Sequence, residues 1–354
     1  MYHELIEKGQ SDLIIIFSSI DCEPSKFRFY RAFINNNTDL LFLNCKNNDW
    51  FLNGIPSLGE DLDSSLLSIK KIIEKNKYER VVTFGSSMGA FGAIMYGSSL
   101  NVDKIFAGCP ELKLGSDGGF YSRFNDGKLD FRDEIRKFSG EVNIFLGEES
   151  YFDISQTSYL TSDNINVYIL NGESHGVFEA IEFDIGCGNL INCYLSGIDL
   201  ETIGFRKDHE YMAYSRVFNN IQNKIRKKLV AIDDIRDLKK ILSTCFNNRV
   251  KSHASFLISV IYMNNNDFSS AKEYSLQACL INSKSPRILC HHFRVCDSDN
   301  DFLSIISFRN ELKAILASKS PRYLENMRSK KIKEAVSFFN KATKVLGING
   351  FLKV

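Results

Sequence analysis

The sequence contains no apolar run that approaches the length of a membrane span, and its 44 basic and 43 acidic residues leave a net charge of +1. A membrane-spanning helix needs about 20 predominantly apolar residues, so we expect no membrane span. The balanced charge gives no reason to expect binding to nucleic acid or to an anionic membrane surface. The composition, 44% hydrophobic and 25% charged, is typical of a globular protein, and 354 residues suffice for two domains.

Signals for export, disulfide bonding and metal binding are also missing. The first eight residues, Met1–Lys8, lack the basic segment and apolar core of a signal peptide. The nine cysteines are an odd number without a Cys-x-x-Cys pair, which favours reduced thiols and a cytoplasmic location. The cluster Cys290-His291-His292 falls in a predicted helix, where adjacent side chains point in different directions. We therefore expect no metal site.

The first 200 residues alternate short apolar runs with segments of helical periodicity. Six buried strands are predicted, at residues 13–17, 40–44, 81–84, 104–107, 142–147 and 166–170. Strands that alternate with helices imply right-handed crossovers and a parallel sheet, and ligands of such sheets bind at the carboxyl ends of the strands. Residues 1–198 are therefore predicted to form an α/β domain with a parallel sheet of about six strands.

The third predicted strand ends in Gly85-Ser86-Ser87-Met88-Gly89 and passes directly into a helix of small residues. Gly-x-Ser-x-Gly between a strand and a helix is typical of a nucleophile elbow, a sharp turn that presents the serine at the edge of the sheet. Glycine suits both flanking positions because neighbouring backbone comes very close there. A glycine-rich turn with a chance serine is the alternative, but the flanking elements favour Ser87 as a nucleophile.

A serine nucleophile needs a base, and that base needs an acid that orients it. Only His3 and His175 fall within the first 200 residues, and His175 follows the sixth predicted strand in a glycine-flanked loop. His175 is therefore the expected base. The acid should come from the loop after the fifth strand, where Asp153 is favoured. Glu148 and Glu149 stay open as alternatives, because the sequence does not show which carboxylate points at the imidazole.

The strand order, the elbow and the chain order serine, acid, histidine resemble those of an α/β-hydrolase domain. The resemblance is to a minimal form without the first antiparallel strands or a long lid. The run Val81–Ala90 and the tryptophan loop Asp49–Gly54 also resemble a group of poorly characterised bacterial hydrolases, some of which are joined to helical repeats. The resemblance implies a serine esterase or related acyl hydrolase that works by two-step acyl transfer without a cofactor.

The resemblance also implies an oxyanion hole formed by backbone amides. One amide belongs to the residue after the nucleophile, here Met88, and the second comes from the loop after the first predicted strand. That loop offers Ser18 and Ser19 in place of the commoner His-Gly pattern. Either serine is therefore a candidate for the second donor.

The expected reaction is hydrolysis of a small-molecule or glycan carboxylic ester, for instance deacylation of a sugar. One alternative is an acyltransferase in which a glycan hydroxyl replaces water, and another is a non-catalytic scaffold that binds a partner through its helical repeats.

Trp50, Tyr121 and Tyr151 lie in loops expected at the active edge of the sheet. They are candidates for an aromatic platform that binds a sugar ring or an acyl group, the alternative being simple loop packing.

Residues 199–354 lose the strand-like runs and show helical periodicity throughout. Asn266-Asp267-Phe268 recurs as Asn300-Asp301-Phe302, 34 residues later, which is the period of tetratricopeptide repeats. The region is therefore predicted to be an all-α, tetratricopeptide-like domain, with a generic helical bundle as the alternative. Stacked helical hairpins leave a concave surface, so a protein partner or self-association through this domain is expected.

Overall fold

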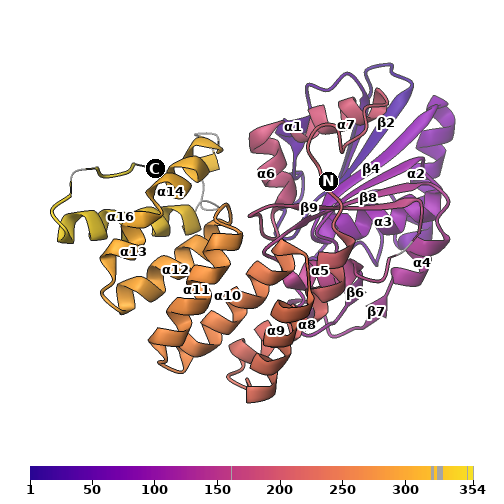
Figure 1. Ribbon diagram of the computed structural model, residues 1–354. Helices are drawn as coiled ribbons and strands as arrows, with labels where there is room; N and C mark the ends of the chain where they lie inside the picture. Colours follow the sequence, from indigo (N-terminus) through magenta and orange to yellow (C-terminus); the bar gives the residue numbers. More distant parts are fainter. Residues whose placement is uncertain (161, 320–322, 325–329, 349, 354) are drawn as a thin grey trace. The chain divides into compact units, whose positions relative to one another are not determined.

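The computed structural model describes residues 1–160, 162–319, 323–324, 330–348 and 350–353. The chain divides into two compact units, Met1–Asp208 and His209–Val354 (Figure 1). The first unit runs beyond the expected boundary at residue 198, because the segment that follows packs on the edge of the sheet. The Phe205 ring lies 5.2 Å from the ring of Phe145, and the Ile169 amide donates to the Arg206 carbonyl at 2.9 Å.

The first unit is built on a sheet of seven strands in the order β1-β3-β2-β4-β5-β8-β9. The strands are β1 (His3–Ile6), β2 (Asp12–Phe17), β3 (Asp39–Leu43), β4 (Arg80–Ser86), β5 (Lys104–Gly108), β8 (Glu141–Gly147) and β9 (Ile165–Leu170). All six predicted strands are present and pair in parallel, as an α/β-hydrolase sheet requires. The α/β fold prediction is confirmed.

The strand β1 corrects the expectation that the first antiparallel strands are missing. It pairs antiparallel with β3, from His3 opposite Leu43 to Ile6 opposite Leu40. All four of its residues are only half-buried. A short strand at the edge of a sheet therefore carries no continuous apolar run, and the pattern that revealed the buried strands could not reveal this one.

Helices cover both faces of the sheet, which explains why its central strands are apolar throughout (Figure 1). One face carries α1 (Tyr30–Phe33), α6 (Val177–Asp184) and α7 (Cys187–Leu195), and the other carries α2 (Leu62–Asn76), α3 (Met88–Leu100) and α4 (Arg132–Lys137). On the first face, the Phe178 ring of α6 stacks on Phe84 of β4 at 4.3 Å. Such packing fixes the strand ends that carry the loops described below.

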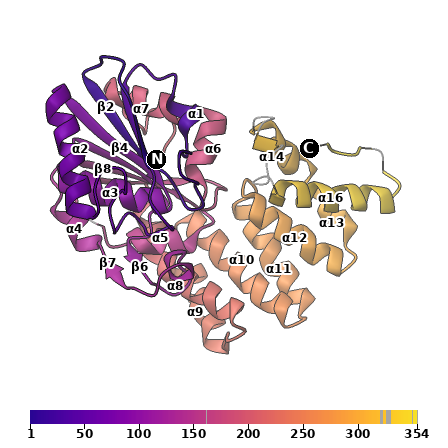
Figure 2. The same ribbon diagram turned by 180° about the vertical axis from the view of Figure 1, so that it is seen from behind.

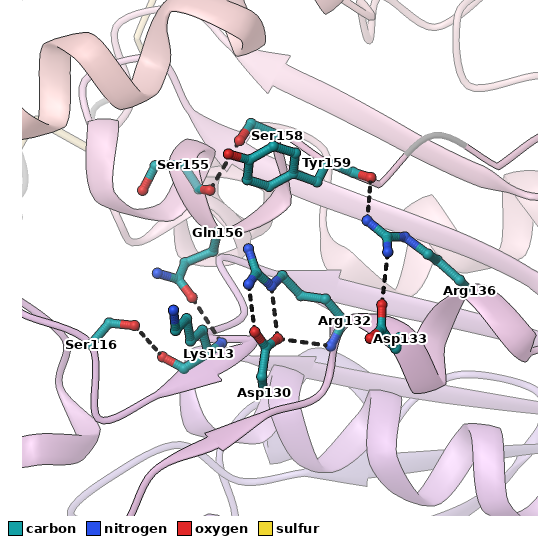
Figure 3. Close-up of polar contacts among 10 residues, drawn as sticks. All are labelled: Lys113, Ser116, Asp130, Arg132, Asp133, Arg136, Ser155, Gln156, Ser158 and Tyr159. Carbon is teal, nitrogen blue, oxygen red and sulfur yellow. Dashed lines mark hydrogen bonds and ion pairs between the residues drawn. The ribbon is translucent and has the colours of Figure 1, made fainter.

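An insertion between β5 and β8 lies beside the helix that follows β8. It contains β6 (Lys113–Leu114), the short 3-10 helix η1 (Tyr121–Arg123), β7 (Leu129–Asp130) and α4, and β8 leads into α5 (Tyr151–Thr157). The Lys113 amide donates to Gln156 Oε1 at 2.8 Å, and the Arg136 guanidinium donates to the Tyr159 carbonyl at 2.8 Å (Figure 3). These two bonds tie the insertion to α5 and to the residues just after it.

The described residues of the second unit form helices and the loops that join or follow them, with no strand among them (Figure 2). Its helices are α8 (His209–Arg226), α9 (Ile232–Thr244), α10 (Asn248–Asn264), α11 (Phe268–Ile281), α12 (Pro286–Ser298), α13 (Phe302–Ser307), α14 (Arg309–Ala317) and α16 (Lys330–Val345). Successive helices pack against one another from α9 to α13. Over the part of the chain that the structure describes, no helix combines the length and the apolar character needed to cross a membrane.

The repeated tripeptide forms the same turn twice in this unit. Asn266 and Asn300 both adopt left-handed backbone, with φ of 62° and 56°. The side chains of Asp267 and Asp301 then cap α11 and α13 by accepting a hydrogen bond from the amide three residues further on, at 3.0 and 3.2 Å. The 34-residue period therefore corresponds to a repeated local structure, and the tetratricopeptide interpretation of the whole region stays a prediction.

The cluster Cys290-His291-His292 lies in α12, and its two imidazoles bond to different helices. His291 Nε2 lies 2.9 Å from the Ser259 hydroxyl on α10, and His292 Nδ1 lies 2.8 Å from the Ser275 hydroxyl on α11. Burial lowers the pKa of His291 to about 3 and the pKa of His292 to about 4. Both side chains are therefore neutral groups that join helices inside the core.

Candidate active site

Ser87 occupies a strained turn between β4 and α3, with φ of 57° and ψ of −119°. A Cβ atom built on Gly85 would lie 2.0 Å from the Gly89 carbonyl oxygen, and one built on Gly89 would lie 2.3 Å from the Phe17 carbonyl oxygen. Neither position has room for a side chain. The Gly-x-Ser-x-Gly pattern is thus a steric requirement of this turn, as the nucleophile elbow demands.

His175, in the loop between β9 and α6, is bonded at both ring nitrogens. Its Nε2 lies 2.8 Å from Ser87 Oγ, and its Nδ1 lies 2.8 Å from Asp153 Oδ2. Because a carboxylate only accepts hydrogen bonds, we assign the proton to Nδ1, so that Nε2 accepts from the Ser87 hydroxyl. The Asp153 side chain is 1% exposed and the imidazole 30% exposed. The acid is therefore shielded from water, while the base is accessible.

Of the three carboxylates expected as candidates for the acid, Asp153 is the one placed on His175 Nδ1. It lies in the first turn of α5 and also accepts from the Ser150 hydroxyl at 2.5 Å. Glu148 is equally buried, but its Oε2 accepts the Gly172 amide at 2.7 Å, at the start of the loop that carries the histidine. The amide of Glu149 donates to the Glu173 carbonyl of the same loop at 2.9 Å.

The two serines expected as oxyanion donors differ in what their amides do. The Ser18 amide donates to the Leu43 carbonyl at 2.9 Å, which continues the β2–β3 ladder beyond the end of β2. This bond occupies the amide and corrects the expectation that Ser18 could serve. Ser19, one residue further on, remains a candidate. Met88 is the first residue of α3, where amides have no carbonyl partner within the helix.

The aromatic residues named as candidates for a substrate platform are buried, which corrects the platform prediction in favour of its alternative, loop packing. Trp50 and Tyr151 are 0% exposed, and Tyr121 is 6% exposed. The Trp50 ring meets the Tyr121 ring edge to face, with centroids 5.1 Å apart. The loop after β3 adopts left-handed backbone at Trp50 and Phe51, with φ of 58° and 60°. Because they are buried, these rings present no face to a substrate in solution. Their burial stabilises the loop instead.

One residue that the sequence did not single out, Phe120, lies beside the imidazole, and a second, Glu111, binds its backbone amide. The half-buried ring of Phe120 stacks on the ring of His175, with centroids 4.7 Å apart and an interplanar angle of 29°. Buried Glu111 accepts the amide of Phe120. The segment between β6 and β7, which carries Phe120, has no helical or strand periodicity, so the sequence does not predict which way its side chains point.

A buried thiol completes the surroundings of the acid. Single ligand atoms of Cys109, Asp153 and His175 lie within 4.8 Å of one another. Burial, and then the charge of Asp153, raises the pKa of the Cys109 thiol well above its usual value. The thiol is thus neutral beside the carboxylate. Cys109 is a neutral neighbour of Asp153.

Comparisons with known proteins give structural likeness at low identity. No protein-family model and no curated protein matches the chain. It is similar to the capsule O-acetyltransferase of Neisseria meningitidis serogroup A, at 18% identity over 57% of this chain and 90% of that chain, with a TM-score of 0.39. It is also similar to an esterase from Pyrococcus furiosus, at 13% identity over 47% of this chain and 74% of that chain, with a TM-score of 0.31.

A third similar structure is a carboxylesterase of Nitrososphaera gargenis, at 10% identity over 50% of this chain and 87% of that chain, with a TM-score of 0.36. Because these identities and TM-scores are low, they carry no argument about activity. The functional proposal depends on the geometry of Ser87, His175 and Asp153.

Proposed function

We propose that the chain is a serine esterase that cleaves a carboxylic ester through an acyl-enzyme. One observation supports this above all: the His175 imidazole is bonded at 2.8 Å to Ser87 Oγ and at 2.8 Å to Asp153 Oδ2. A serine hydroxyl is a weak nucleophile until a base takes its proton, and the base must be held in one tautomer. The three side chains meet both requirements.

In the first half of the proposed reaction, His175 Nε2 takes the Ser87 proton as Oγ bonds to the ester carbonyl carbon. The amides of Met88 and Ser19 would donate to the oxyanion of the tetrahedral intermediate. Loss of one such donor typically costs about 3 kcal/mol of transition-state stabilisation. The carbon–oxygen bond to the alcohol then breaks, and His175 gives its proton to the leaving oxygen.

In the second half, water attacks the acyl-enzyme and gives a proton to His175 Nε2. The bond to Ser87 Oγ breaks, the serine regains its proton, and a carboxylic acid leaves. Asp153 Oδ2 accepts a hydrogen bond from the Nδ1 proton, which stays on His175 throughout, and the carboxylate stabilises the imidazolium that forms in each half. Replacement of the water by a sugar hydroxyl would turn the same steps into acyl transfer. The substrate class that the sequence resemblance suggests is an acylated sugar or glycan, from which the enzyme would remove the acyl group.

The first test is labelling with a fluorophosphonate probe, which reacts with activated serines. We expect the wild type to be labelled, Ser87→Ala to be unlabelled and His175→Ala to be strongly impaired. The neighbouring Ser86→Ala is the matched control, because Ser86 is buried at the end of β4 and should not be needed for labelling. If the folded wild type is not labelled, the proposal is wrong and the scaffold alternative is favoured.

A second assay separates hydrolysis from transfer. The wild type would be given a p-nitrophenyl ester in the presence and absence of an acceptor sugar, and the carboxylic acid and the acylated sugar would both be measured. A hydrolase releases acid at the same rate with or without the acceptor. An acyltransferase forms mainly acylated sugar and turns over slowly in water alone.

A further inference from the structure

We propose that Phe120 is a positioning residue for His175 and that Glu111 acts on the histidine through Phe120. The inference rests on the proposed function, in which His175 is the base. Both residues belong to the segment that follows β5, outside the elbow and the loops that carry the histidine and its acid. The Phe120 ring stacks on the imidazole with centroids 4.7 Å apart and an interplanar angle of 29°.

The two hydrogen bonds of the imidazole leave one motion weakly restrained. Both bonds, to Ser87 and to Asp153, lie near the plane of the ring, so they resist its translation more than its tilt about the line joining the nitrogens. A flat ring against one face of the imidazole opposes that tilt. Stacked aromatic pairs attract one another beyond the effect of burying their area. The contact with Phe120 therefore favours one orientation of the base.

Glu111 holds the backbone of the segment that carries this ring. Its side chain is buried, and Oε2 accepts the amides of Phe120 at 2.8 Å and Tyr121 at 3.0 Å. A Cβ atom on Gly119 would lie 2.0 Å from Glu111 Oε1, so glycine leaves the room that the carboxylate occupies. The carboxylate and the glycine together fix where the Phe120 backbone lies.

The carboxylate of Glu111 lies in a buried place where its charge is unfavourable. Burial raises its pKa, the two bound amides lower it, and the nearby charges of Asp153 and His175 act in opposite directions. Within the described part of the chain, Glu111 Oε1 is buried without a hydrogen-bond partner. An unsatisfied buried oxygen costs stability, and the two amide bonds at Oε2 offset part of that cost.

Two further contacts fix the Phe120 ring and connect its segment to the helix that carries Asp153. The Arg123 guanidinium lies over the Phe120 ring, 4.3 Å from its centroid. The bond from the Lys113 amide to Gln156 ties the same insertion to α5, the helix that carries Asp153 (Figure 3). The ring that contacts the imidazole and the acid that orients it are thus parts of one connected structure.

The test compares Phe120→Ala with Phe124→Ala in turnover of p-nitrophenyl acetate. Phe124 is the matched control, because it is an exposed phenylalanine of the same segment whose ring lies 6.0 Å from that of Trp50. We expect Phe120→Ala to lower kcat by about threefold to tenfold with KM within about twofold, because the loss of one stacked aromatic contact leaves the imidazole in its reactive orientation less of the time. Phe120→Tyr, which keeps the ring, should stay near the wild type. A kcat of Phe120→Ala equal to that of Phe124→Ala would overturn the proposal.

The indirect role of Glu111 is tested by a double-mutant cycle. Glu111→Gln keeps an oxygen that can accept the amides, so it should stay near the wild type. Glu111→Ala should lose about the same factor in kcat as Phe120→Ala. If Glu111 acts through Phe120, the double variant Glu111→Ala/Phe120→Ala is no slower than the slower single variant. Losses that multiply in the double variant would refute the indirect role.

A measurement that needs no turnover distinguishes this proposal from the proposed function. Proton NMR of the full chain should show a slowly exchanging downfield signal from the His175 Nδ1 proton, identified by its loss in His175→Gln. We expect the signal to be lost or broadened in Phe120→Ala and kept in Phe124→Ala, with both variants folded by circular dichroism. A signal unchanged in Phe120→Ala contradicts the positioning role. The expected pattern in a protein without esterase activity would contradict the proposed function alone.

Discussion

The substitution Asp153→Asn tests the orientation of the proposed base most directly. The carboxylate is 1% exposed and accepts from His175 Nδ1 at 2.8 Å and from the Ser150 hydroxyl at 2.5 Å. Asparagine has nearly the same shape, so the packing of α5 should be kept. Its amide nitrogen, however, donates towards Nδ1 and thereby favours the tautomer with the proton on Nε2. Nε2 then no longer accepts from the Ser87 hydroxyl, and the base is lost.

The expected loss follows from the role of that tautomer. In triads of this kind, replacement of the acid by its amide lowers kcat by about 10⁴, which corresponds to about 5.5 kcal/mol of barrier. The stability of the fold should stay the same or rise, because the substitution removes a charge that is buried at 1% exposure. A large kinetic loss without loss of stability is the expected signature.

The assay is the rate of ester turnover at saturating substrate, with urea denaturation as the measure of stability. Glu148→Gln is the control, since Glu148 is also buried and accepts the Gly172 amide, a bond that glutamine can keep. It should retain near wild-type turnover. Residual activity of Asp153→Asn within about tenfold of the wild type would refute the reasoning, as would an equal loss in Glu148→Gln.

Further predictions concern the elbow, the buried histidines and the charge near the base. Gly89→Ala should destabilise the first unit by about 1–3 kcal/mol, because the new Cβ lies 2.3 Å from a carbonyl oxygen; denaturation followed by the fluorescence of the single tryptophan measures this. Burial holds the pKa of His291 at about 3 and that of His292 at about 4, so only the unfolded chain binds these protons between about pH 6.5 and 4. The free energy of unfolding should decrease as the pH falls through this window, by on the order of 2 kcal/mol per histidine at about pH 5. Unfolding followed by circular dichroism should show a weaker pH dependence of this free energy in a His291→Gln/His292→Gln variant. Arg123→Gln should raise KM severalfold at low salt for an ester whose leaving alcohol carries a phosphate and not for a neutral ester. The guanidinium lies over the ring that stacks on His175, so its positive charge is near the base and attracts an anionic substrate.

The sequence predicted the parts of the site that local sterics and chain order define. The turn at Ser87 admits only glycine at the two flanking positions, and this restriction is visible in five consecutive residues. The strands that lead to Asp153 and His175 are buried on both faces and therefore apolar throughout. Their order in the chain was then sufficient to predict which loops meet at one edge of the sheet.

Other features depend on contacts that no local pattern encodes. The choice between Ser18 and Ser19 depends on whether the β2–β3 ladder ends at Phe17 or continues for one more amide. The polar loop around Trp50 does not show whether its ring faces a substrate or packs inside; its backbone conformation and its contact with Tyr121 place it in the interior. Both outcomes are set by tertiary packing, which overrides the local pattern.

The strand order explains why the segment after β5 reaches the active site at all. In the sheet, β5 lies between β4, which presents Ser87, and β8, which leads to Asp153. The chain that leaves β5 therefore emerges between the nucleophile and the acid, and some side chain from it must border the imidazole. Glu111, three residues beyond the strand, then selects Phe120 for that place by binding its amide. The strand order thus explains why a side chain from this segment borders the imidazole, and the hydrogen bond from the Phe120 amide to Glu111 explains why that side chain is Phe120.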